Sequence, residues 1–152
     1  MTTAVTKKVA SKESRNKEKV ELIPFGQYYG TGRRKEAIAK VWLSPGTGKF
    51  IVNDVQIKDY LLRDSLIEIA NSPFRATDTV GKYDVRCRVS SGGIAGQAGA
   101  IVMGIARALV QVSEELKEKL GQGGMLTRDD RMKERKKYGR KRARKSFQYR
   151  KR

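Results

Sequence analysis

The chain has 152 residues, of which 34 are Lys or Arg and 16 are Asp or Glu, so that its net charge is +18. A single cysteine, Cys87, excludes an intramolecular disulfide, and the absence of histidine removes most of the usual zinc ligands. The charge is uneven: residues 135–152 contain 11 basic and no acidic residues, whereas residues 1–25 contain six basic and three acidic ones. The composition therefore predicts a nearly neutral body with a strongly basic C-terminal tail that binds a polyanion.

Residues 1–25 lack an apolar run that could serve as a signal peptide, and they include three glutamates, which organellar transit peptides avoid. We predict that they form a disordered leader. A globular domain should follow over residues 26–126, and an extended basic tail over residues 127–152. No stretch approaches 18 uninterrupted apolar residues, so we expect no membrane partner.

The first part of the body predicts strands and one helix. Residues 37–43 alternate apolar side chains on one face, as a strand does, and residues 44–48, SPGTG, predict a turn. Residues 50–53 would then form a second strand and close a hairpin with the first. Residues 57–71 have apolar side chains at helical spacing, and we expect that helix to stop at Ser72 and Pro73.

The second part of the body opens on the most regular strand of the chain, residues 83–90, YDVRCRVS. Its apolar face includes Cys87, which we therefore expect to be a core residue and not a reactive thiol. The opposite face presents Arg86 and Arg88, a basic patch that ordinary surface charge explains equally well. Residues 113–120, SEELKEKL, predict a short solvated helix with Ser113 placed to cap it.

The segment SGGIAGQ, residues 91–97, is a glycine-rich loop before an apolar helix, an arrangement that can hold phosphate. A dinucleotide fingerprint would need glycine at Ser91, and a P-loop would need Gly-Lys-Ser/Thr at residues 96–98. The alternative is a tight strand-to-helix connection, in which Gly99 and Gly104 let the helix lie close to the sheet. The missing motifs favour this structural interpretation.

Other catalytic arrangements are absent from the sequence pattern. Without histidine, general-base chemistry would fall to carboxylates or lysine. Asp129, Asp130 and Glu134 cluster, but they stand among four basic residues, where surface ion pairs are the ordinary explanation. We expect no enzymatic activity, no cofactor and no metal.

The basic tail cannot fold alone, because like charges repel and too little apolar surface offsets the entropy of ordering. RNA binding would release counterions, and six phosphate contacts would give a log–log salt slope of about −5. The arginines suit bidentate phosphate contacts. Tyr138, Phe147 and Tyr149 offer flat faces for unstacked bases, although they could instead pack against the body.

Three segments carry a resemblance to a known family, and they are GTGRRKEAIAKVWLSPGTGKFIVN, SGGIAGQAGAIVMGIARALV and LTRDDRMKERKKYGRKRARKSFQYRKR. In this order and spacing they resemble ribosomal protein nine of the bacterial-type small subunit, the universal S-nine family, from about residue 27 to residue 152. The most specific parts are Gly-Arg-Arg-Lys at residues 32–35, Gly-Gly-x-x-Gly-Gln at residues 92–97 and Glu-Arg-Lys-Lys at residues 134–137.

The resemblance implies an α+β fold like the second domain of ribosomal protein S-five, with a four-stranded sheet, helices on one face and a left-handed βαβ crossover. It implies a structural constituent of the small ribosomal subunit that binds ribosomal RNA in the head. The tip of the tail would approach the transfer RNA in the peptidyl site. The implied partners are small-subunit ribosomal RNA, this transfer RNA and neighbouring head proteins, with no homo-oligomer. The implied location is the cytoplasmic ribosome, and an organellar ribosome stays open.

The candidate site residues follow from this resemblance and from the charge of the tail. Those expected to bind ribosomal RNA are Arg33, Arg34, Lys35, Arg128, Arg131, Arg135, Lys136, Lys137, Tyr138, Arg140, Lys141, Arg142, Arg144, Lys145, Phe147, Gln148 and Tyr149. Those expected to bind transfer RNA are Arg150, Lys151 and Arg152, at the tip.

The sequence departs from the family pattern at several positions. Ser91 stands where many members have a third glycine, and Asp130 where proline or alanine is common. Near the end, Ser146, Phe147 and Arg150 stand where Ala-Pro and Ser often appear. The missing proline frees the backbone at Phe147, so the last part of the tail is expected to be less rigid, and Arg150 is expected to add a phosphate contact.

Three other functions compete with the ribosomal one. A histone-like architectural protein also uses basic tails, and it is the main alternative. A small kinase-like enzyme on a related fold lacks its motifs here. A membrane-active peptide would need an opposed apolar face, which residues 135–152 lack.

Overall fold

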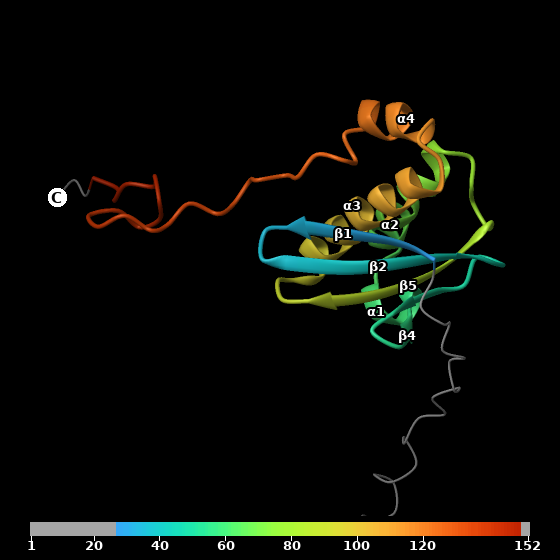
Figure 1. Cartoon of the computed structure of the whole chain (residues 1–152). Coiled ribbons are helices and arrows are strands. Elements are labelled where there is room, and N and C mark those ends of the chain that lie inside the picture. Colours follow the sequence, from blue (N-terminus) through green and yellow to red (C-terminus); the bar gives the residue numbers. More distant parts are fainter. Residues whose placement is uncertain (1–26, 150–152) are drawn as a thin grey trace, which may run out of the picture.

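The computed structural model describes residues 27–149 (Figure 1). The predicted leader, residues 1–25, and the tip residues 150–152 lie outside the described residues. The strands are β1 (Tyr28–Arg34), β2 (Ala37–Pro45), β3 (Phe50–Val52), β4 (Val55–Gln56) and β5 (Tyr83–Ser90). The helices are α1 (Ile57–Leu61), α2 (Asp64–Ala76), α3 (Ile94–Val112) and α4 (Leu116–Gln122). The predicted α+β class is confirmed.

The strands form one sheet in the order β1-β2-β5-β3-β4, which has five strands where the resemblance implied four. β2 pairs antiparallel with both β1 and β5, and β3 runs parallel to β5. The predicted hairpin of β2 with β3 is therefore wrong, because both edges of β2 are occupied by other strands. The chain leaves β3 through β4, α1 and α2 before it returns to the sheet as β5.

Strand β1 is an element that the sequence pattern did not predict, and the two-residue strand β4 is another. The inward positions of β1 are Gly30 and Gly32, so the alternation of apolar side chains that indicates a strand is missing. A Cβ atom at Gly32 would lie 1.8 Å from the carbonyl oxygen of Ala100, and one at Gly30 would lie 2.1 Å from that of Gly104. The backbones of β1 and α3 therefore touch, and only glycine permits this approach.

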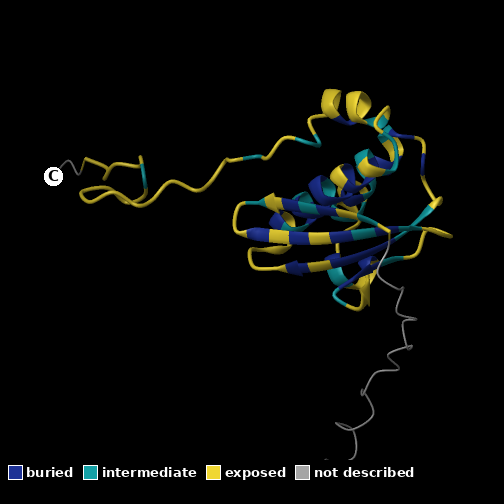
Figure 2. Ribbon diagram, in the orientation of Figure 1, coloured by how far each residue is buried: buried dark blue, intermediate teal, exposed yellow. Residues whose placement is uncertain are grey.

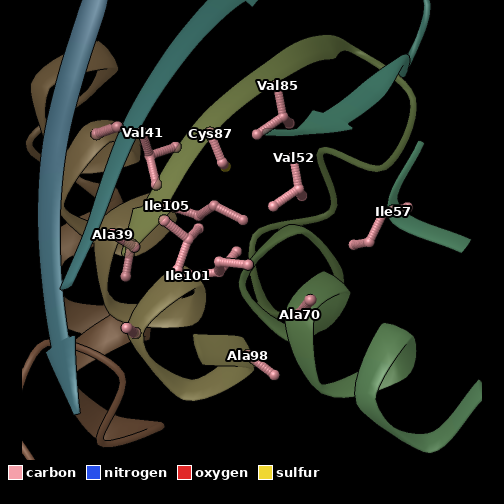
Figure 3. Close-up of a cluster of buried hydrophobic side chains, with 14 of the residues drawn as sticks. Ala39, Val41, Val52, Ile57, Ala70, Val85, Cys87, Ala98, Ile101 and Ile105 are labelled. Atoms are coloured by element: carbon pink, nitrogen blue, oxygen red, sulfur yellow. The ribbon is translucent and has the colours of Figure 1, made fainter. Parts of the chain in front are cut away.

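Helix α3 covers the inner face of the sheet and forms the core (Figure 3). Its buried stripe, including Ile101 and Ile105, packs against Val41 of β2 and Cys87 of β5, as predicted for both segments. By length and composition α3 could also cross a membrane, with a mean hydropathy of 1.3, but it is the central helix of this fold. The burial pattern in Figure 2 alternates along β2, so that the opposite face of the sheet is more exposed.

The predicted helix over residues 57–71 is two helices, which separate at Leu62. This residue has φ +57°, and its side chain is 76 % exposed, although it was expected on the apolar stripe. α2 also continues through Pro73, where a stop was predicted. Pro73 has no N–H to donate to the carbonyl of Ile69, and the hydroxyl of Ser72 donates to that carbonyl instead, at 2.7 Å. The missing hydrogen bond is thereby replaced.

Helix α4 begins at Leu116, later than predicted. Ser113 ends α3, since its N–H donates to the carbonyl of Leu109, and no side-chain cap at α4 comes from it. Leu120 is fully buried, so α4 is anchored to the core and is more than a solvated helix.

Candidate nucleic-acid interface

The turn between β1 and β2 presents the first group of candidate residues. Arg33 and Lys35 are exposed, and Lys35 takes a left-handed backbone conformation with φ +52°. Arg34 lies on the helix side of the sheet, beside Gly99, where an added Cβ would meet its Cδ at 2.3 Å. Gly99 therefore makes room for Arg34, whereas Gly104 brings α3 close to the sheet as expected.

Arg34 holds the root of the tail. Its Nη2 atom lies 3.1 Å from Oδ2 of Asp129, and the same carboxylate accepts hydrogen bonds from the backbone N–H, Nε and Nη2 of Arg131. The hydrogen bonds from Arg131, with a contribution from the charge of Arg34, lower the pKa of Asp129 to about 2. The ion pairing expected around Asp129 is confirmed, and it joins the tail to the end of β1.

A pocket of about 160 Å³ opens beside this ion pair. Its walls include Gly99 and Met103 of α3, Met125 after α4, and the two partners Arg34 and Asp129. The pocket has the ion pair at its edge and apolar side chains behind it. It marks the place where the chain leaves the body.

Beyond Asp129 the described tail runs away from the body (Figure 1), and Figure 2 shows it almost entirely exposed. It turns back on itself between Glu134 and Ser146. Nε of Arg144 donates to Oε2 of Glu134 at 2.8 Å, and Nη1 of Arg140 donates to the carbonyl oxygen of Arg144 at 2.7 Å. The hydrogen bond from Arg144 lowers the pKa of Glu134. The carboxylate of Glu134 thus holds the turn of the basic segment together through its ion pair with Arg144.

The rings of the tail face solvent. Tyr138 is 97 % exposed, Tyr149 95 % and Phe147 64 %. The Nζ atom of Lys141 lies 5.6 Å from the centroid of the Phe147 ring, a cation–π contact within the turn. The rings therefore do not pack against the body, which was the alternative.

The glycine loop at residues 91–97 is held by one of its own side chains, by a side chain of α1 and by one from the turn between β3 and β4. Gln97 donates to the carbonyl oxygen of Ser91 at 3.1 Å and accepts a hydrogen bond from the hydroxyl of Tyr60 at 2.8 Å. Asn53, with φ +48°, bonds the same hydroxyl and both backbone groups of Val89. This network supports the structural interpretation of the loop. The sequence reasoning missed Asn53 and Tyr60, for which the only signal was an asparagine directly after a strand.

The predicted patch of Arg86 and Arg88 is corrected by the structure. Arg86 is only 9 % exposed, and its Nη2 lies 3.3 Å from Oδ1 of Asp54. Arg88 is exposed. Cys87 between them is 1 % exposed, so the expectation of a core cysteine is confirmed, and burial raises the pKa of its thiol.

A comparison with protein families shows to which family the chain belongs. The family model described as ribosomal protein S9/S16 matches residues 32–152, which include the turn after β1, the glycine loop and the whole tail. The chain belongs to the ribosomal protein S9/S16 family. Members are structural, non-enzymatic proteins of the small ribosomal subunit that bind ribosomal RNA, so the resemblance seen in the sequence is confirmed and the chain is a component of the ribosome.

Within this S9/S16 protein, the candidate residues fall into two groups. Arg34, Arg131 and Arg144 are held by carboxylates of the chain itself. The other described candidates are exposed and lie at the turn after β1 or along residues 128–149. The tail therefore presents most of its charge to solvent while its root is fixed.

Proposed function

We propose that the body of this protein docks on ribosomal RNA in the head of the small subunit and that its tail threads inward along the RNA. The observation that carries the proposal is the tail itself. It leaves the body at the Arg34–Asp129 ion pair and exposes its cations and rings over residues 135–149. A segment with this charge and no core of its own needs a dense polyanion as its partner.

The residues proposed to contact ribosomal RNA are those given above from Arg33 to Tyr149. Each Lys or Arg that neutralises a phosphate releases counterions, and the planar guanidinium groups can bind phosphate with two hydrogen bonds. The exposed rings of Tyr138 and Tyr149 are available to unstacked bases. The body would thus orient the protein on the RNA, and the tail would contact RNA at a distance from the body.

The tip, Arg150, Lys151 and Arg152, is proposed to add electrostatic hold on the transfer RNA in the peptidyl site. Neighbouring head proteins are further proposed partners, in a cytoplasmic or an organellar ribosome. For the body we propose the fold of the second domain of ribosomal protein S-five, with a left-handed crossover. The parallel pair β3 and β5, joined through α1 and α2, supports this assignment.

The test compares two truncations of the full chain in cells that carry no other copy of the protein. Removal of residues 150–152 should leave incorporation into small subunits unchanged and increase the dissociation rate of peptidyl-site transfer RNA. Removal of residues 135–152 should impair incorporation as well. A matched control replaces Lys117 and Lys119 of α4 by glutamine, which removes two exposed charges from the body and none from the tail. Loss of incorporation on removal of three residues would contradict the division between body and tip.

A further inference from the structure

Strand β1 forms one edge of the sheet (Figure 1). The opposite edge is β4, which has only two residues and therefore offers little for another strand to pair with. β1 has seven residues, and its side away from β2 carries backbone N–H and C=O groups that a second strand could bond. An edge of this length can drive association between chains unless other groups of the protein occupy it.

Two side chains of α3 bond the backbone of this edge strand. Oε1 of Gln111 accepts a hydrogen bond of 3.1 Å from the N–H of Tyr29, and Nη1 of Arg107 donates one of 2.9 Å to the carbonyl oxygen of Thr31. Because the N–H of Tyr29 is bonded to α3 and not to β2, it points to the free edge. The backbone groups of Thr31, two residues further along the strand, point to the same edge.

The spacing of the two side chains on the helix matches the spacing of the two groups on the strand. Arg107 and Gln111 are four residues apart, which is about 6 Å along a helix, and they lie on one flank of α3. Tyr29 and Thr31 are two residues apart, which is about 6.6 Å along a strand. The contact between the backbones of β1 and α3 brings the edge within reach of both side chains.

A second copy of this chain is the simplest partner for the edge, because β1 could pair with itself. Two antiparallel β1 strands related by a two-fold axis at Thr31 would place Tyr29 of each copy opposite Arg33 of the other. The N–H of Tyr29 and the carbonyl of Thr31 are among the groups that this pairing needs, and both are already bonded. Pairing would therefore break two hydrogen bonds in each copy.

We propose that Arg107 and Gln111 guard the edge of β1 and prevent the free protein from pairing with a second copy of itself. Both side chains are exposed, and hydrogen bonds at exposed positions add little to the stability of a fold. Their position at the edge nevertheless occupies groups on which strand pairing depends. The inference concerns the protein before it meets RNA, and it does not rest on the ribosomal function.

The test removes the two hydrogen bonds and keeps the side chains long. The full-length double variant Arg107→Met with Gln111→Met retains residues of good helix propensity. The matched control is Lys117→Met with Gln122→Met, which also removes one charge and one amide from exposed positions of a helix. Sedimentation equilibrium in about 0.5 M salt, which screens repulsion between the basic chains, measures self-association. We expect the double variant to self-associate at least about tenfold more tightly than the wild type and the control, because pairing no longer breaks the guard.

A cross-link shows whether the association uses β1. Thr31→Cys, added to the double variant, would place the same residue of two copies opposite each other at a Cα separation of about 5.5 Å, which a disulfide tolerates. The natural Cys87 is buried and should not compete. We expect a disulfide-linked dimer in this background and at least about tenfold less of it when Thr31→Cys is the only change.

Three outcomes would overturn the proposal. A double variant that stays as monomeric as the wild type would show that the edge needs no guard. Equal association of the double variant and the control would assign the effect to the added methionines. Association without the cross-link at position 31 would assign it to another surface.

A second measurement applies if the double variant does not fold. Amide hydrogen exchange is then compared between the wild type and the single variant Gln111→Met. Loss of the acceptor should make the N–H of Tyr29 exchange at least about tenfold faster, because an unbonded N–H at an open edge is not protected. An unchanged rate would contradict the proposal, since the edge would then not be held by Gln111.

Discussion

Arg34 and Asp129 stand 95 positions apart in the sequence, yet Nη2 of the arginine and Oδ2 of the carboxylate are 3.1 Å apart. The arginine belongs to β1, whose backbone rests against α3, and the carboxylate belongs to the root of the tail. The glycines of β1 bring its backbone into contact with α3, and this packing holds the backbone of β1, and so the position of Arg34, in place. The pair therefore sets the direction in which the tail leaves the body.

Replacement of Asp129 by Asn should release this root. The overall stability should change little, because the pair is partly exposed and such pairs contribute weakly. Residues near the root should instead gain mobility, seen as lower ¹⁵N order parameters between residues 127 and 133. The matched control is Asp130→Asn, which should leave them unchanged. Equal mobility in the wild type and the Asp129→Asn variant would show that the ion pair does not direct the tail.

The same pair gives an expected pH dependence. The pKa of Asp129 is lowered from 3.8 to about 2, so the carboxylate favours the folded arrangement fully above its unfolded value. This contribution is lost as pH falls from about 4 toward about 2. An NMR titration of the Asp129 carboxyl carbon should show a midpoint near pH 2. A midpoint near pH 3.8 would mean that Arg131 and Arg34 do not stabilise the ionised carboxylate of Asp129.

Glu134 should act as an internal competitor of RNA. Its carboxylate pairs with Arg144, and the pKa of Glu134 is lowered by that hydrogen bond. The change Glu134→Gln should therefore tighten binding to ribosomal RNA by about twofold to fivefold, the range expected for loss of one exposed pair. Filter binding at fixed salt measures this, with Glu118→Gln on α4 as control. Weaker binding would instead show that Glu134 presets the tail for RNA.

The contact of β1 with α3 predicts a strong effect of one methyl group. Gly32→Ala would place a Cβ atom 1.8 Å from the carbonyl oxygen of Ala100 and should cost about 3 kcal/mol or more in the free energy of unfolding. Gly121→Ala is the control, because no atom lies within 4 Å of a Cβ there, and it should stabilise α4 by about 0.5–1 kcal/mol. Urea denaturation followed by circular dichroism measures both. Similar stabilities of the two variants would disprove the close approach.

At Ser91, in contrast to Gly32, a substitution is expected to increase the free energy of unfolding. Ser91 adopts φ +60°, a conformation that costs L residues free energy and that glycine accepts. Ser91→Gly should therefore raise the free energy of unfolding by about 0.5–1 kcal/mol. Ser90→Gly, one residue earlier in β5, should lower it. If both variants are destabilised, backbone strain at Ser91 is not significant.

The periodic spacing of apolar side chains predicted β2, β5 and the buried stripe of α3. Strands bury every second side chain and a helix buries one stripe, so each of these elements leaves a regular pattern in the sequence. The periodic spacing missed β1, whose inward positions are glycines that contact a helix backbone and leave no apolar signal. It also misplaced the end of α2, because the hydroxyl of Ser72 replaces the hydrogen bond that Pro73 cannot make. These features depend on tertiary contacts, which a local pattern does not contain.

The candidate site shows the same division. The exposure of the tail cations followed from composition, since too few apolar residues were present to bury them. The pairing of Arg86 with Asp54 did not, because the turn that brings Asp54 to β5 depends on left-handed backbone at residues 53 and 54. The link from Arg34 to Asp129 is likewise set by packing and not by spacing in the sequence.

The central claim is that this protein is an integral RNA-bound component of the small ribosomal subunit. The most direct test is sedimentation of the native protein from gently lysed cells through sucrose gradients, run in parallel at about 0.1 M and about 1 M salt. We predict co-migration with the small subunit in both, because the proposed RNA contacts of the body and of the tail would act together. Migration with DNA, or at the top of either gradient, would contradict the account and favour an architectural DNA-binding protein.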